Sequence, residues 1–239
     1  GEKECAAMAL EAEKLLNAWG LGMKGSLGEG NHSRLSPLGK LVPTWLSSRD
    51  VLPTPDYTED SHPDWPWQNA ALINVEGFLD CYSEILAANL DLLGLPVRSC
   101  SLTLRDLETL RANPSEFRSI NIARVLDRPE NFEPLVEELD KAAGQAEAII
   151  IPACLGLKDP GRTGMLERRL GREIRLIPTL PPSLVGSRIN RLLARLFIDK
   201  GGVLMPGAQA TGFDLAPGPG PVRVRRLFTA PPVEPPLDA

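Results

Sequence analysis

Short apolar runs and longer amphipathic segments alternate along the chain between residues 70 and 207. Apolar runs bounded by turn residues are typical of buried strands, whereas apolar residues three and four positions apart indicate helices. This pattern predicts strands at residues 71–75, 97–104, 148–152, 174–177 and 203–205. It predicts helices at residues 78–93, 113–126, 129–144, 164–170 and 184–200. Asn113, followed by Pro114 and Glu116, has the pattern of a helix cap.

Strands that alternate with helices favour a three-layer α/β fold, in which a mostly parallel sheet carries helices on both faces. A helix is predicted at residues 2–19, and two short strands around residues 37–39 predict a small antiparallel hairpin region. Residues 222–228 are predicted to form an antiparallel strand. We therefore divide the chain into three parts: the N-terminal helix, hairpin and Pro/Asp-rich connector at 1–69, the α/β domain at 70–207, and a strand with a Pro-rich tail at 208–239.

Polar or glycine-containing segments follow three of the predicted strands, at residues 76–77, 153–156 and 179–183. Open α/β sheets bind ligands beyond the carboxyl ends of their strands, so Cys154, Thr179 and Ser183 are candidates for a ligand-binding edge. Ser183 also stands where the cap of the following helix belongs. A plain strand–helix–strand crossover with good capping is the alternative.

Composition excludes several classes of function. A net charge of −5, from 31 acidic and 26 basic residues, argues against nucleic-acid binding. No apolar run approaches the ~20 residues of a membrane-spanning helix. The four cysteines show no Cys-x-x-Cys spacing, which favours reduced thiols in a cytoplasmic protein over disulfides. Two histidines, His32 and His62, cannot form a metal cluster without carboxylates arranged with them, and the sequence shows no such arrangement, so no metal is predicted.

Four segments of the chain have sequences similar to those of one protein family, in the same order along the chain. They are residues 36–48, 115–124, 151–156, and 178–188 continued by 200–207. At these spacings the chain resembles the B subunits of anaerobic glycerol-3-phosphate dehydrogenases, a flavoprotein family. The resemblance covers most of the chain from about His32 to Gly207. It does not extend to residues 49–68 or to the residues after Gly207.

The flavin domain of that family is built from flanking segments that this sequence does not show. The Gly-x-Gly-x-x-Gly at Gly20, Gly22 and Gly25 follows a predicted helix instead of a strand. We interpret it as a helix end and a turn, with a phosphate-binding loop as the alternative. The chain is thus expected to be the family's middle domain, with Gly1 a cloning scar. No flavin is expected in this chain alone, and the resemblance implies FMN or FAD in the full-length protein.

The resemblance implies a flavin-dependent, quinone-linked enzyme that oxidises glycerol 3-phosphate to dihydroxyacetone phosphate. It implies two partners, a catalytic flavoprotein subunit and an iron–sulfur subunit that anchors the complex to the membrane. The expected location is then cytoplasmic and peripheral to the inner face of the cell membrane. This chain would be the cap or substrate-side domain, inactive alone. Two alternatives stay open, a non-catalytic subunit-docking module and an unrelated α/β domain that binds a small molecule.

Oxidation of an alcohol phosphate needs a base for the hydroxyl proton and cations for the phosphate. His32, Arg34 and Thr44, in the hairpin segment that resembles the family, are therefore candidates, with His32 as the catalytic one. A solvated hairpin is the alternative. Arg188, in the helix after Ser183, is a further candidate for the edge that faces the flavin domain.

Arg118, Asn121 and Arg124 recur every three residues and so share one face of a predicted helix. They are candidates for an interface with the flavin domain or a partner subunit. A salt-bridged surface is the alternative.

Overall fold

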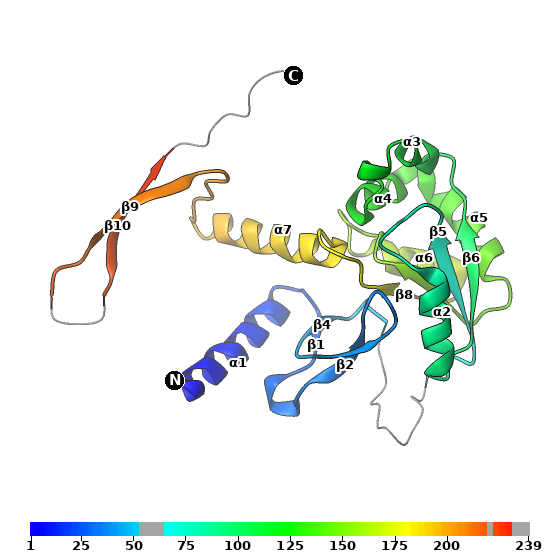
Figure 1. The fold of residues 1–239 in the computed structure, drawn as a ribbon, viewed down its shortest axis with the longest axis horizontal. Coiled ribbons are helices and arrows are strands. Elements are labelled where there is room, and N and C mark those ends of the chain that lie inside the picture. Colours follow the sequence, from blue (N-terminus) through cyan, green and yellow to red (C-terminus); the bar gives the residue numbers. More distant parts are fainter. Residues whose placement is uncertain (53–64, 219–221, 231–239) are drawn as a thin grey trace. The chain divides into compact units, whose positions relative to one another are not determined.

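The computed structural model describes residues 1–52, 65–218 and 222–230 (Figure 1). The Pro/Asp-rich connector predicted before residue 70 lies largely outside these residues. In chain order the elements are α1 (Glu2–Ala18), β1 (Met23–Lys24), η1 (Leu27–Glu29), β2 (His32–Leu35), β3 (Leu41–Thr44), β4 (Ser47–Ser48), β5 (Ala70–Val75), α2 (Ser83–Leu92), β6 (Val97–Leu102), α3 (Leu107–Arg111), η2 (Pro114–Glu116), α4 (Ser119–Leu126), η3 (Pro129–Asn131), α5 (Phe132–Ala143), β7 (Ala148–Pro152), α6 (Arg162–Leu170), β8 (Glu173–Ile177), α7 (Leu184–Asp199), β9 (Gln209–Leu215) and β10 (Val224–Ala230).

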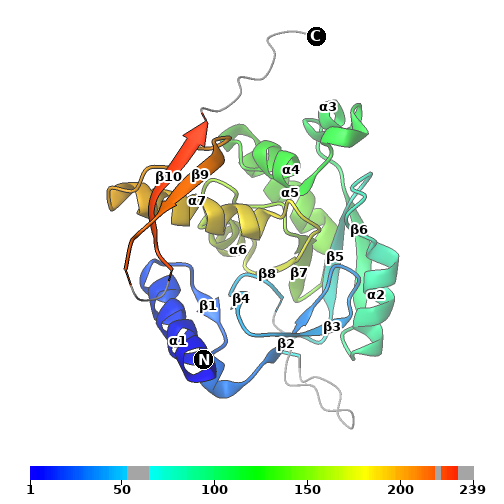
Figure 2. The same ribbon diagram turned by 60° about the vertical axis from the view of Figure 1, so that its left-hand side comes forward.

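A four-stranded parallel sheet in the order β6-β5-β7-β8 forms the core. β7 is buried along its whole length, which is why it reads as a continuous apolar run. One face of the sheet packs against the apolar sides of α4, α5 and α6, and the other against α2 and Leu35 of the hairpin. Figure 2 shows these helices on opposite sides of β5 and β7. The predicted three-layer α/β fold is therefore confirmed.

The N-terminal segment joins this sheet at its β8 edge. β2 and β3 form the predicted antiparallel hairpin, and β1 pairs with β4. The chain then runs beside β8, where Val51 makes a parallel bridge to Leu176. Leu52 N–H donates to the Leu176 carbonyl, and Leu176 N–H donates to the Asp50 carbonyl, both at 2.9 Å. This pairing holds residues 47–52 next to the segment that leaves β8.

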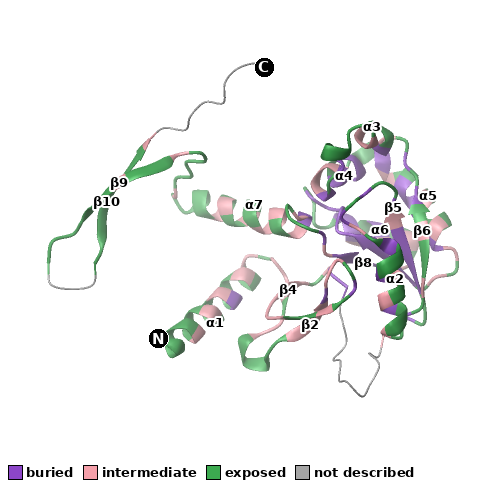
Figure 3. Cartoon of the chain, viewed as in Figure 1, coloured by how far each residue is buried: buried purple, intermediate pink, exposed green. Residues whose placement is uncertain are grey.

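The chain divides into two compact units, Gly1–Asn190 and Arg191–Ala239. In the second unit, β10 pairs antiparallel with β9, from Val224 opposite Leu215 to Ala230 opposite Gln209. Most side chains of this hairpin are exposed, whereas buried residues of the first unit gather in the sheet and the helices against it (Figure 3). The division into residues 1–69, 70–207 and 208–239 stays a prediction.

Two predicted helix starts are wrong. Residues 78–82 are not helical, and α2 begins only at Ser83, after Gly77 with its φ of +84° has turned the chain at the end of β5. The Asn113 side chain makes no cap hydrogen bond, and the expected long helix is split into η2 and α4. Phe117 causes the split, because it leaves helical geometry to bury its ring in the core.

The prediction of a strand at residues 203–205 is also wrong. This segment is largely exposed and irregular, and Pro206 follows it without an N–H group for a sheet ladder. The strand instead begins at Gln209, four residues after the predicted strand ends, and pairs with β10. The antiparallel strand expected at residues 222–228 is confirmed, two residues further along, as β10.

Candidate functional site

The segment after β8 carries two of the predicted site residues. Ser183 Oγ accepts a hydrogen bond from Gly186 N–H at 3.1 Å, so Ser183 caps α7 as its sequence position predicts. Thr179 is only 7% exposed, and its hydroxyl has no hydrogen-bond partner among the described residues. A buried hydroxyl without a partner is unusual and indicates either a cost to stability or a ligand contact.

A cavity of about 430 Å³, here called the strand-end cavity, opens beside this segment. Arg34, Thr44, Thr179 and Ser183 all line it, so the fold brings together four residues that the sequence singled out. Its remaining wall is mostly apolar, and includes Met23, Leu46, Val51, Leu180, Val185 and Ile189. A mostly apolar cavity with a few polar groups is typical of a small-molecule site.

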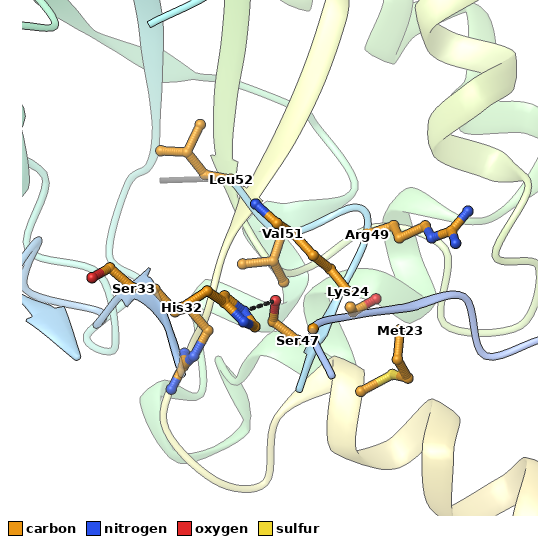
Figure 4. A pocket seen from close by; sticks show the side chains of 11 residues that line it. Met23, Lys24, His32, Ser33, Ser47, Arg49, Val51 and Leu52 are labelled. Atoms are coloured by element: carbon orange, nitrogen blue, oxygen red, sulfur yellow. Dashed lines mark hydrogen bonds between the residues drawn. The ribbon is translucent and has the colours of Figure 1, made fainter. Parts of the chain in front are cut away.

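A second cavity of about 470 Å³, here called the cationic cavity, adjoins the first. The two share five lining residues, Met23, Arg34, Ser47, Ser48 and Val51. Lys24, His32, Arg34 and Arg49 line the cationic cavity, and none of its described lining residues is acidic. In Figure 4 the His32 ring points to Ser47, and His32 Nε2 lies 2.8 Å from Ser47 Oγ.

Gly25 fixes the backbone beside His32. It has a φ of +105°, and a Cβ there would lie 2.0 Å from the Trp45 carbonyl oxygen and 2.8 Å from Cε1 of His32. Only glycine fits this close approach. The Gly-x-Gly-x-x-Gly pattern thus ends in the wall of the cationic cavity.

The same glycines do not form a flavin dinucleotide turn. The pattern follows α1, its middle holds the two-residue strand β1, and the element after it is the short 3₁₀-helix η1. A dinucleotide turn needs a strand before it and a helix whose N-terminus meets the pyrophosphate. Residues 20–25 therefore do not fit the phosphates of FAD.

Glu13 of α1 ties the N-terminal helix to the hairpin. Its carboxylate accepts hydrogen bonds from Trp45 Nε1 at 2.6 Å, Leu27 N–H at 2.5 Å and Ser26 Oγ at 3.1 Å. Burial raises the pKa of Glu13, but these three donors outweigh it and hold the pKa below its ordinary value. The contact fixes Trp45, the neighbour of Thr44.

Two predicted site residues lie outside both cavities. Arg188 donates from Nε to the Gly156 carbonyl at 2.6 Å and from Nη2 to the Leu155 carbonyl at 2.5 Å, and Nη1 lies 2.5 Å from Asp50 Oδ2. Cys154 is fully buried, and burial raises the pKa of its thiol. The structure places both in the scaffold beneath the strand ends.

The three interface candidates take part in surface hydrogen bonds. Arg118 Nη1 lies 3.2 Å from Asp80 Oδ1, Asn121 Nδ2 donates to Glu116 Oε2 at 2.8 Å, and Arg124 Nη1 donates to Asn121 Oδ1 at 2.8 Å. These contacts are expected for a salt-bridged surface, the alternative interpretation of this helix face in the sequence analysis. The interface stays a prediction.

Lys24 and Arg49 are lining residues that sequence reasoning missed. Each belongs to or follows a two-residue strand, where Lys24 stands opposite Ser47 in the β1–β4 pair. A strand of two residues has no period that could mark which side chains face inward. The only sequence signal for these two cavity residues was their position, since Lys24 directly precedes Gly25 and Arg49 directly follows Ser48.

Neither a metal site nor a membrane span is found in the described part of the chain. Its His, Cys, Asp and Glu residues form no group of three that could hold a metal ion. Within residues 1–52, 65–218 and 222–230, no helix has the length and hydropathy to cross a membrane.

Comparison with known proteins agrees with the resemblance seen in the sequence. The B subunit of anaerobic glycerol-3-phosphate dehydrogenase from Yersinia enterocolitica is 46% identical over 199 residues, which are 83% of this chain and 46% of the relative. The corresponding protein from Pectobacterium carotovorum is 44% identical over 216 residues, 90% of this chain and 50% of the relative. That from Actinobacillus pleuropneumoniae is 34% identical, over the whole of this chain and 54% of the relative.

The chain therefore spans about half the length of the curated relatives it matches. No solved structure matches it. The sequence pattern of one family, described as the FAD binding domain, matches residues 3–234. Because that match covers nearly the whole sequence, the chain belongs to the FAD binding domain family.

Proposed function

We propose that this chain is the substrate-side domain of a flavin-dependent, quinone-linked glycerol-3-phosphate dehydrogenase. The names of its relatives and its family support the enzyme class. The observation that carries the substrate-side role is the strand-end cavity, where Arg34, Thr44, Thr179 and Ser183 meet and the Thr179 hydroxyl lacks a partner among the described residues. Supplying that partner is a role for a substrate hydroxyl.

The chemistry assigns a role to His32. Oxidation of glycerol 3-phosphate to dihydroxyacetone phosphate converts a secondary alcohol to a ketone, so a base must accept the hydroxyl proton. His32 lines the cationic cavity and is oriented by Ser47 and by the close approach of Gly25. Imidazole is the side chain best suited to exchange a proton near neutral pH.

The flavin belongs to the rest of the full-length protein in this proposal, since residues 20–25 do not fit a dinucleotide. The family name supports FAD as that flavin, and FMN stays a prediction. The partners we propose are a catalytic flavoprotein subunit and an iron–sulfur subunit that anchors the complex to the cytoplasmic face of the membrane. The word subunit in the relatives' names supports an assembly of several chains.

Thr179→Val in the full-length protein, assembled with its partner subunits, tests the substrate-side role. Because the hydroxyl has no partner in the described part of the chain, its loss should leave the melting temperature unchanged or slightly higher. A lost substrate hydrogen bond of about 1.4 kcal/mol should lower kcat/KM for glycerol 3-phosphate about tenfold. Steady-state kinetics with a quinone as electron acceptor measures kcat/KM of the variant and of the wild type.

Thr163→Val is the matched control. Thr163 is also a buried threonine whose hydroxyl has no described partner, but it lines neither cavity. Its substitution should leave kcat/KM unchanged. Equal kcat/KM values for Thr179→Val and wild type would refute the substrate-side role.

One observation favours the docking module as a second candidate. Phe213, Leu227 and Val224 of the β9–β10 hairpin are each about 60% exposed, and an isolated two-stranded hairpin is marginally stable in water. A partner surface would cover these side chains. Ser substitutions at Phe213 and Leu227 should then release the partner subunits during co-purification, and unchanged co-purification would exclude the hairpin as the docking surface. The third alternative, an unrelated α/β domain, conflicts with the 46% identity to the relative from Yersinia enterocolitica.

A further inference from the structure

No carboxylate of the described residues compensates the charge of the cationic cavity, although the chain as a whole is acidic. Lys24, Arg34 and Arg49 form no ion pair with any described carboxylate. Asp50, which follows Arg49 directly, is engaged by Arg188 and by the Ser48 hydroxyl. Like charges gathered in a cavity repel one another, so their arrangement favours an anion.

We infer that the cationic cavity binds the phosphate of a small polyol phosphate monoester, whose hydroxyl-bearing carbons lie at the shared wall with the strand-end cavity. This assignment rests on the proposed function and adds Lys24, Arg49 and the orientation of the ligand to it. A phosphate dianion accepts charge-assisted hydrogen bonds from guanidinium and ammonium groups. Ser47 and Ser48 supply hydroxyls at the wall that the cavities share.

Arg34 lies where the two cavities join, because it lines both of them. One of its N–H groups, on Nη1, donates to the Leu35 carbonyl at 3.3 Å, which leaves other guanidinium donors for a ligand. Lys24 and Arg49 line only the cationic cavity, and Thr179 lines only the strand-end cavity. A phosphate on the cationic side therefore directs the far hydroxyl of the same molecule toward Thr179. The carbon next to the phosphate-bearing one then stays at the shared wall beside Ser47, whose hydroxyl lies 2.8 Å from His32 Nε2.

The volume suits such a ligand. The cationic cavity, at about 470 Å³, lies within the ~300–1,000 Å³ of small-molecule sites, and the shared wall gives a short polyol chain room to extend. Two apolar lining residues, Met23 and Val51, sit at that shared wall. Glycerol 3-phosphate has the required parts, a dianionic phosphate and two neighbouring hydroxyls.

Calorimetric titration of the 239-residue chain tests the inference without any flavin. Inorganic phosphate and glycerol 3-phosphate should bind, glycerol 3-phosphate more tightly, and glycerol should give no signal at the same concentrations. Arg34→Ala should weaken phosphate binding at least about tenfold, and Arg34→Lys less. Lys24→Ala with Arg49→Ala should weaken phosphate binding about tenfold or more, at an unchanged melting temperature.

Lys40→Ala is the matched control. Lys40 lies in the same hairpin as Arg34 but lines neither cavity, and its substitution also removes one positive charge. Phosphate affinity within about twofold of wild type is expected for it. Equal weakening by Lys40→Ala and Arg34→Ala, or no binding of phosphate by the wild-type chain, would overturn the inference.

The outcome separates this inference from the proposed function. Two results together would support the anion site and refute the substrate-side role: phosphate binding that depends on Arg34, and normal oxidation of glycerol 3-phosphate by the Thr179→Val variant. Absence of phosphate binding, together with impaired oxidation by Thr179→Val, would refute the anion site alone.

Discussion

Replacing Arg188 with alanine should destabilise the first unit by about 3 kcal/mol. The guanidinium joins three segments, since it contacts Asp50 beside β8 and the carbonyls of Leu155 and Gly156 after β7, while Arg188 itself belongs to α7. A Cβ on Gly156 would lie 2.4 Å from Nη2 of Arg188, so the guanidinium sits tightly against this backbone.

The magnitude follows from burial. The Arg188 side chain is 11% exposed and that of Asp50 is 23% exposed. Removal of one partner from a buried ion pair costs about 3–5 kcal/mol, and the partial exposure of Asp50 places this pair at the lower limit. For a unit of this size, about 3 kcal/mol corresponds to a fall in melting temperature of about 6–12 °C.

Urea unfolding followed by circular dichroism measures the effect, with Arg195→Ala as the control on the same helix. Arg195 is 81% exposed and lies 3.9 Å from Asp199, so its loss should change the free energy of unfolding by less than about 0.5 kcal/mol. Combination of Arg188→Ala with Asp50→Asn should be non-additive by about 2 kcal/mol. Wild-type stability for Arg188→Ala, with reduced turnover of the full-length protein, would refute the scaffold role and favour the flavin-facing one.

Three further perturbations test individual contacts. Ser183→Ala should cost about 1 kcal/mol in the free energy of unfolding through the lost cap of α7, and an unchanged value would show that the cap adds nothing. Glu13→Gln should destabilise the chain above pH 4.5, and the difference from wild type should shrink as the pH falls through the lowered pKa of Glu13, because protonation removes the same charge; a difference that grows toward low pH would contradict the three-donor contact. Iodoacetamide at about pH 8 should modify exposed Cys5 before Cys81 and Cys154, since burial raises the pKa of Cys81 to about 11 and that of Cys154 further, and equal labelling in mass spectra would exclude the buried placement.

The sheet could be predicted from the sequence because its signals are local. The apolar runs of β5 and β7 are continuous, as expected for strands buried on both faces. The hairpin around Gly39 and the cap at Ser183 were also predictable, since each depends on a few neighbouring residues.

Tertiary contacts decided the elements that could not be predicted. Phe117 turns into the core and divides a segment that carries a helix-cap pattern. β9 is defined by its pairing with β10 and not by its own composition, because most of its residues are exposed and Gly212, in its middle, has no side chain. Local propensity gives no information about either event.

The candidate site was predicted in part for the same reason. Thr179 and Ser183 follow a strand whose end the sequence marks clearly, and the fold brings Arg34 and Thr44 to the same cavity. Arg188 has a position that suggests a ligand edge, but its role depends on Asp50, 138 residues away in sequence. Lys24 and Arg49 reach the cationic cavity through the pairing of β1 with β4, which no sequence period announces.

A crystal structure of this chain with glycerol 3-phosphate would show where the phosphate and the hydroxyls bind. We expect phosphate oxygens within about 3 Å of the Arg34 guanidinium, and a ligand hydroxyl at hydrogen-bond distance from the Thr179 hydroxyl. Glycerol 3-phosphate bound outside both cavities, or with its phosphate at Thr179 and its hydroxyls among Lys24 and Arg49, would contradict this expectation.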